Sequence, residues 1–229
     1  MNTVNKLGFW SAIVSAVMSA IWFITYTFRD QIYPVPAWFE LQQYAQEFSP
    51  LRVLYVYPSL LLPLSFIVLL ACIHRSVAEE KRIWSLIALS FGILYAVMAS
   101  INYNIQAVSV RMSLAAGETS GIEMFLPDNP DSIITALANS YVYMALSMVA
   151  AGFVFENIGL QRWVRWIFFA QAISAIGQVG WSMFDLSMNI FILTSLIWVI
   201  GAPVSFVLTG VLFSRSRLKL TAQAARNPG

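Results

Sequence analysis

Residues 7–28 read LGFWSAIVSAVMSAIWFITYTF, and this stretch decides the fold. It contains no charged side chain, and it lies between Lys6 and the pair Arg29 and Asp30. An α-helix rises about 1.5 Å per residue, so about 20 apolar residues span the hydrocarbon core of a bilayer. The apolar core of a secretory signal peptide is shorter, about 7–15 residues. We therefore expect residues 7–28 to form an uncleaved membrane-spanning helix.

Five further stretches share this pattern of a long apolar run that ends at charged or turn-forming residues. The six expected spans are residues 7–28, 52–73, 83–110, 133–155, 163–184 and 188–213. Most of them open or close with an aromatic residue of the kind that favours the headgroup region: Trp10, Tyr55, Trp84, Trp163, Trp166 and Trp181. The sequence therefore predicts an all-α fold, a polytopic membrane helix bundle of about six transmembrane helices. We expect residues 1–229 to form a single domain.

The composition agrees with a membrane protein. Hydrophobic residues make up 59% of the 229 residues and charged residues only 10%, whereas soluble domains carry about 25% charged residues. The net charge of +2 comes without a basic cluster, so we expect no nucleic-acid partner. Cys72 is the single cysteine, which excludes a disulfide within the chain.

Charged residues are unevenly distributed between the loops. Ten of the thirteen basic residues lie in the termini and the second and fourth loops: Lys6, Arg75, Lys81, Arg82, Arg162, Arg165, Arg215, Arg217, Lys219 and Arg226. Eight of the eleven acidic residues lie in the odd-numbered loops: Asp30, Glu40, Glu47, Glu118, Glu123, Asp128, Asp131 and Asp185. Because loops rich in Lys and Arg stay in the cytoplasm, we expect both termini there.

Two loops on the expected outer side are long. In residues 30–51, Leu41, Tyr44 and Phe48 follow helical spacing with polar residues between them. This pattern predicts a short amphipathic helix, either a connector lying on the membrane surface or a lid over a cavity. In residues 112–132, the run Asp-Asn-Pro-Asp-Ser at 128–132 predicts a turn and then the N-cap of the next helix.

No Asp, Glu, Lys or Arg lies deep inside an expected span. Proton relays and ion-coupled transporters normally keep such a residue within the membrane. His74 is the only histidine, which excludes a site built from several histidines. The sequence contains no phosphate-binding glycine loop, HExxH or CxxC motif. We therefore expect no catalytic residue, no metal site and no cofactor.

Uncharged polar residues form stripes along three consecutive spans. Within each stripe the residues are three or four positions apart, so they share one helix face. The stripes are Tyr95, Ala99, Asn102, Gln106 and Ser109, then Thr135, Asn139, Tyr143 and Ser147, then Gln171, Ser174, Gln178, Trp181 and Asp185. From the helical rise, Asn102 and Gln106 lie about 7–14 Å, and Asn139 and Gln178 about 9 Å, from the outer ends of their spans.

Two interpretations of the stripes remain open. Carboxamides and hydroxyls often hold membrane helices together, at about 0.6–2 kcal/mol for each pair. Alternatively, they line a cavity that opens outward and holds a ligand. The candidate ligand-binding residues are Asn102, Gln106, Asn139, Tyr143, Gln178 and Trp181.

Three segments carry a resemblance to a known group of proteins. They are SINYNIQAVSVR at 100–111, NPDSIITALANSYVYMALSM at 129–148 and PVSFVLTGVLFSRSR at 203–217. The chain resembles small bacterial six-helix membrane proteins of unknown function. The resemblance implies a multi-pass protein of the bacterial inner membrane, and it implies no activity and no site residue.

Three functions fit these features. The first is a protein without catalytic activity that binds a small apolar or amphipathic molecule, or a lipid, in an outward-facing cavity, as a sensor, carrier or resistance factor would. The second is a membrane enzyme acting on a sterol or isoprenoid, although such enzymes usually need an acid or base in the pocket. The third is an alternating-access transporter, although no inverted repeat joins the two halves. Membrane lipids are the expected surroundings in each case.

Overall fold

The computed structural model describes residues 2–32, 41–127, 129 and 132–215. Within these residues, six helices are long and apolar enough to cross a membrane, and there is no strand. The six spans are Thr3–Gln31, Pro50–Ser76, Glu79–Ala115, Ile133–Gly152, Gly159–Phe184 and Met188–Ser214. The prediction of an all-α bundle with about six membrane-spanning helices is confirmed.

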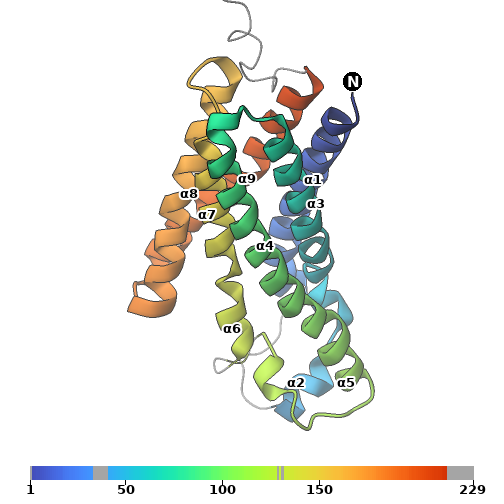
Figure 1. Ribbon diagram of the computed structural model, residues 1–229. Helices are drawn as coiled ribbons and strands as arrows, with labels where there is room; N and C mark the ends of the chain where they lie inside the picture. Colours follow the sequence, from blue (N-terminus) through green and yellow to red (C-terminus); the bar gives the residue numbers. More distant parts are fainter. Residues whose placement is uncertain (1, 33–40, 128, 130–131, 216–229) are drawn as a thin grey trace, which may run out of the picture.

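The long helices pack as a closed ring (Figure 1). They are α1 (Thr3–Ile32), α3 (Val56–Ser76), α4 (Arg82–Asn104), α7 (Ser140–Gly152), α8 (Gly159–Phe184) and α9 (Met188–Ser214). Each packs against the next along the chain, and α9 packs against α1. The largest fully buried side chains face its interior, among them Phe66, Phe155, Phe168 and Phe206.

Two of the expected spans are interrupted along their length, and the span predicted at 52–73 becomes α-helical only at Val56. The span predicted at 83–110 is α4, followed by a π-helix, η3 (Ile105–Val110), and a short helix, α5 (Arg111–Ala115). The span predicted at 133–155 is α6 (Ile133–Ala138) followed by α7, which ends at Gly152. Neither interruption contains Pro or Gly, so the usual sequence signals of a break are missing.

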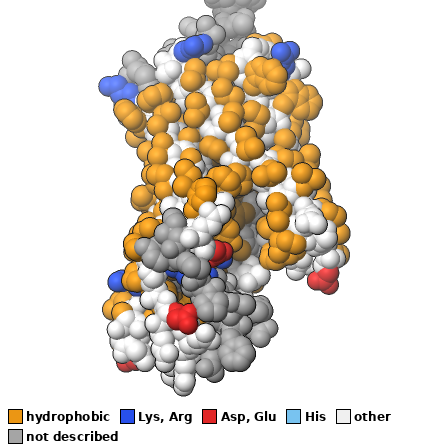
Figure 2. All heavy atoms as spheres, turned by 180° about the vertical axis from the view of Figure 1, so that it is seen from behind, with side chains coloured by type: hydrophobic (Ala, Val, Ile, Leu, Met, Phe, Trp, Pro, Cys, Tyr) orange, Lys and Arg blue, Asp and Glu red, His pale blue; other side chains and the backbone are white. Residues whose placement is uncertain are grey.

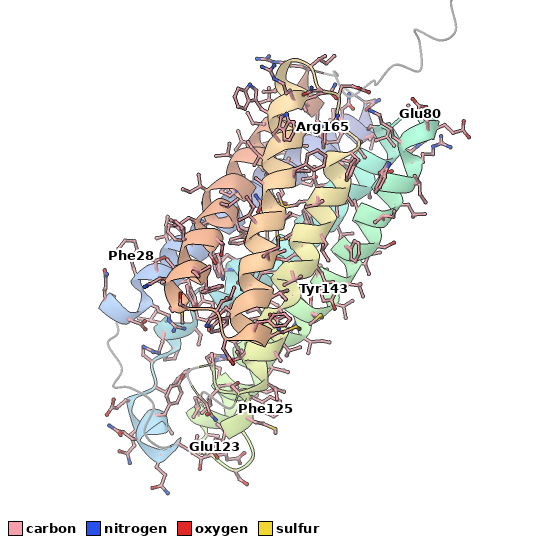
Figure 3. All side chains as sticks on the ribbon, turned by 90° about the vertical axis from the view of Figure 1, so that its left-hand side faces the viewer. Phe28, Glu80, Glu123, Phe125, Tyr143 and Arg165 are labelled. Atoms are coloured by element: carbon pink, nitrogen blue, oxygen red, sulfur yellow. The ribbon has the colours of Figure 1, made fainter. Side chains whose placement is uncertain are left out.

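The two ends of the bundle differ in charge. Arg165 and Glu80 lie at one end, and Glu123 and Phe125 lie at the other (Figure 3). We name the first the basic end, because it carries the α3–α4 and α7–α8 connections and most described Lys and Arg residues. The second, which carries most described Asp and Glu residues, is the acidic end. Between them, hydrophobic side chains cover most of the face in Figure 2.

Contacts between loops close the basic end. Lys81, in the 3-10 turn η2 (Glu79–Lys81), forms an ion pair with Glu156 and donates to the backbone oxygen of Val154 at 3.1 Å. The side chain of Gln161 accepts a hydrogen bond from the backbone N–H of Glu156 at 3.0 Å. These contacts join the α3–α4 connection to the α7–α8 connection.

A small cap covers part of the acidic end. It consists of α2 (Leu41–Glu47), η1 (Pro50–Val53), α5 and η4 (Glu123–Phe125). Tyr44 is buried in an apolar cluster with Val110, Leu114, Ile122 and Leu126. The apolar face of α2 therefore packs on η3 and α5, which favours a covering element over a connector on the lipid. Residues 33–40 of the loop predicted at 30–51 lie outside the described residues.

The predicted N-cap before the fourth span is present. Ser132 Oγ accepts a hydrogen bond from the backbone N–H of Ile134 at 3.1 Å. The same hydroxyl donates to the backbone oxygen of Met124 at 2.9 Å, which ties the start of α6 to the cap. Asp128, Pro130 and Asp131 of the predicted turn lie outside the described residues.

Candidate functional site

The acidic-end half of the bundle contains two interruptions of regular helix. At η3 the third span widens into a π-helix. This form is rare in proteins, and where it occurs it is often at a functional site. At Asn139 the fourth span tightens, because Asn139 N–H bonds to Ala136 O at 3.1 Å and Val142 N–H bonds to Asn139 O at 3.0 Å. Irregular backbone at membrane depth is tolerated where protein buries it or where it lines a wet cavity.

Asn102 and Gln106 form the first group of candidate residues. Both are buried, and Gln106 Nε2 donates to Asn102 Oδ1 at 2.6 Å. Gln106 Oε1 accepts from the Tyr55 hydroxyl, also at 2.6 Å. Tyr55 precedes α3, so this chain of bonds connects the second span to the π-helix of the third.

Asn139 and Gln178 form a separate pair. Gln178 Nε2 donates to Asn139 Oδ1 at 3.2 Å and thereby links α8 to the α6–α7 break. No hydrogen bond between described residues joins this pair to Asn102 or Gln106. The carboxamides that share a predicted depth are therefore divided into two groups.

The remaining two candidates lie elsewhere. Tyr143 is half-buried on α7 and packs against the apolar core (Figure 3). The Trp181 ring stacks on Phe191 with a centroid distance of 4.8 Å, so it belongs to the contact between α8 and α9. Neither side chain takes part in the two carboxamide groups.

A group of contacting aromatic residues lies in the acidic-end half of the bundle, and sequence reasoning singled out only part of it. We call it the aromatic cluster; it comprises Trp22, Tyr26, Tyr55, Tyr95, Tyr103, Tyr141 and Trp198. Its rings come from α1, the start of α3, α4, α7 and α9. Trp198 lies 5.1 Å from Trp22 and 5.0 Å from Tyr141, measured between ring centroids.

The polar atoms of the aromatic cluster are unequally satisfied. The hydroxyls of Tyr103 and Tyr141 are hydrogen-bonded to each other at 2.7 Å. The Tyr95 hydroxyl and the Nε1 atoms of Trp22 and Trp198 are buried and have no hydrogen bond with any described residue. The Trp22 indole lies near the Tyr103 hydroxyl without good hydrogen-bond geometry. Buried polar groups are usually paired, so unpaired ones call for an explanation.

Charged side chains lie at the edge of the aromatic cluster, near the end of α1. The Arg29 guanidinium stands 4.7 Å from the ring centroid of Tyr26 and 5.8 Å from that of Tyr55. Asp30 contacts Arg29 and Arg52, each at 3.3 Å. The cluster itself offers rings and hydrogen-bond donors, and it contains no carboxylate, imidazole or amine.

The described residues contain no group of three or more His, Cys, Asp or Glu side chains placed to hold a metal ion. No protein-family model, curated protein or solved structure matches this chain. The resemblance to small bacterial six-helix proteins therefore rests on the sequence alone.

Proposed function

We propose that this protein binds a small uncharged or lipid-like molecule within the acidic-end half of its membrane-spanning bundle. The observation that supports this most is the set of buried, unpaired polar atoms in the aromatic cluster. An unpaired polar group in an apolar interior costs free energy, and a ligand that hydrogen-bonds to it removes that cost. The two helix interruptions beside the cluster support the same location.

The activity proposed for this protein is binding without catalysis. General acid–base chemistry needs a positioned group that exchanges a proton near neutral pH, and the aromatic cluster contains no carboxylate, imidazole or amine. Binding alone is the activity of a sensor or of a subunit of a carrier. We further propose that the basic end faces the cytoplasm of a bacterial inner membrane, so that the ligand enters from the outer side.

Mass spectrometry of molecules that co-purify with the full-length protein tests the proposal. We expect a small molecule in amounts near one per chain, above the background of bulk phospholipid. Gln106→Leu should reduce its amount, because the change removes the amide that orients Tyr55 and Asn102 at the margin of the cluster. Asn104→Leu is the matched control, since Asn104 is exposed and bonds only within its own helix, to Ser100 O.

Two outcomes would overturn the proposal. One is the recovery of bulk phospholipid alone from the wild-type protein. The other is equal retention of the small molecule by the wild-type protein, the Gln106→Leu variant and the Asn104→Leu control. Binding would then be independent of this half of the bundle.

A further inference from the structure

The unpaired atoms of the aromatic cluster define the chemistry that they can recognise. An indole N–H only donates, and a phenol hydroxyl can donate as well as accept. Trp198 is 5% exposed and Tyr95 is fully buried, and both contact the ring of Tyr141. A molecule that satisfies Trp198 and Tyr95 together must therefore supply acceptor atoms.

The depth of these donors decides between two kinds of lipid-soluble ligand. Trp22 lies ten residues before the end of α1, and Trp198 lies ten residues after the start of α9. At the helical rise Trp198 lies about 15 Å from the start of α9, and Trp22 lies about 9 Å from Phe28, the last residue before the charged pair Arg29 and Asp30. Both indoles therefore lie within the hydrocarbon core, below the headgroup region. A phospholipid keeps its phosphate and esters near the surface. Acceptor atoms at the depth of Trp22 and Trp198, below the headgroups, belong to an uncharged molecule that lies within the apolar layer.

Charge and shape restrict the ligand further. An ion at this depth would be desolvated without a partner of opposite charge in the cluster, at high cost. Arg29, at the margin over Tyr26 and Tyr55, repels a cation. The surrounding rings favour a flat ring, because aromatic pairs stack or meet edge to face.

We infer that the aromatic cluster binds an uncharged ring compound with carbonyl oxygens, the chemistry of a membrane quinone, and that Tyr95 and Trp198 donate hydrogen bonds to it. This inference rests on the proposed function and names its ligand class. Binding alone is inferred, with no transfer of electrons or protons.

Titration of full-length protein in lipid nanodiscs with decylubiquinone tests the inference, with binding followed by calorimetry and by the thermal unfolding midpoint. We expect saturable binding and a higher midpoint for the wild type. Tyr95→Phe and Trp198→Phe should each weaken binding about 2- to 13-fold, the effect of one lost hydrogen bond. Tyr57→Phe and Trp163→Phe are the matched controls, because both side chains are exposed on the bundle surface.

A second measurement separates ligand binding from a structural role. Without ligand the Tyr95 hydroxyl has no partner among the described residues, so Tyr95→Phe should keep or raise the midpoint of the unliganded protein. A lower midpoint would mean that the hydroxyl already holds an internal water, and the inference would be overturned. Tetraphenylphosphonium, a cationic ring compound, should not raise the midpoint. If it did so more than decylubiquinone, the cluster would be a cation site.

The remaining outcomes separate the inference from the proposed function. If decylubiquinone does not bind while a co-purified molecule still depends on Gln106, the quinone chemistry is wrong and the proposed function stands. If decylubiquinone binds equally to wild type, Tyr95→Phe and Trp198→Phe, it binds elsewhere and the inference fails. If no small molecule binds or co-purifies, both proposals fail.

Discussion

The Tyr55 hydroxyl donates a 2.6 Å hydrogen bond to Gln106 Oε1 across two neighbouring spans. Both residues are buried, so water cannot replace a lost partner easily. We predict that Tyr55→Phe and Gln106→Leu each destabilise the bundle by about 0.6–2 kcal/mol, the range for polar contacts between membrane helices. A double-mutant cycle in unfolding experiments should give a favourable coupling energy. Strictly additive effects would show that the two side chains do not interact.

Asn139 and Gln178 offer a second cycle with a different expectation. They bond to each other at 3.2 Å, at the break between α6 and α7. We predict that Asn139→Leu and Gln178→Leu each cost about 0.6 kcal/mol of stability and leave retention of the co-purified ligand unchanged. If either variant lost the ligand but kept its stability, Asn139 and Gln178 would belong to the binding site. That result would support the cavity interpretation made from the sequence.

Span number and placement follow from the sequence because length and hydropathy dominate the free energy of insertion. The breaks at η3 and Asn139 do not follow from it. The residues around them, such as Ile105 and Ala138, are ordinary helix residues, and side-chain hydrogen bonds from neighbouring spans reach both breaks. Periodicity placed Asn102 and Gln106 on one face, as the bond between them requires, but it could not show which neighbour each carboxamide meets.

The aromatic cluster was only partly visible in the sequence. Tyr95 lies on a polar stripe, and Tyr103 and Tyr141 lie beside carboxamides. Trp22 and Trp198 are each the only polar-atom-bearing aromatic residue in their part of an apolar run. A single indole N–H there does not predict a polar site. The one usable sign was their position well inside a span, since tryptophan otherwise favours the membrane interface.

Orientation can be measured with introduced cysteines. Cys72 is buried, and Cys72→Ala gives a background without thiols. We predict that Ser120→Cys, at the acidic end, reacts with a membrane-impermeant maleimide in intact spheroplasts. Glu80→Cys, exposed at the basic end, should react only after the membrane is permeabilised. The opposite pattern would place the basic end outside, against the distribution of Lys and Arg, and would reverse the proposed route of ligand entry.

The cap at the acidic end gives a prediction about local stability. Tyr44 is buried against Val110 and Leu114, so Tyr44→Ala removes a large part of the contact between α2 and the end of the third span. We predict faster amide hydrogen exchange across η3 and α5, because local opening depends on few apolar contacts there. Exchange in α8 and α9 should stay unchanged, since neither helix belongs to this cluster.

Tyr57→Ala serves as the control for this change. Tyr57 lies in the first turn of α3 and is 49% exposed. Its truncation removes a side chain of the same kind that lies outside the cap. Exchange in η3 and α5 should then match the wild type. If exchange in η3 and α5 also stayed as slow as in the wild type when Tyr44 is changed to Ala, α2 would not hold the π-helix in place. Its apolar face would then rest on the membrane surface, and α2 would be a connector.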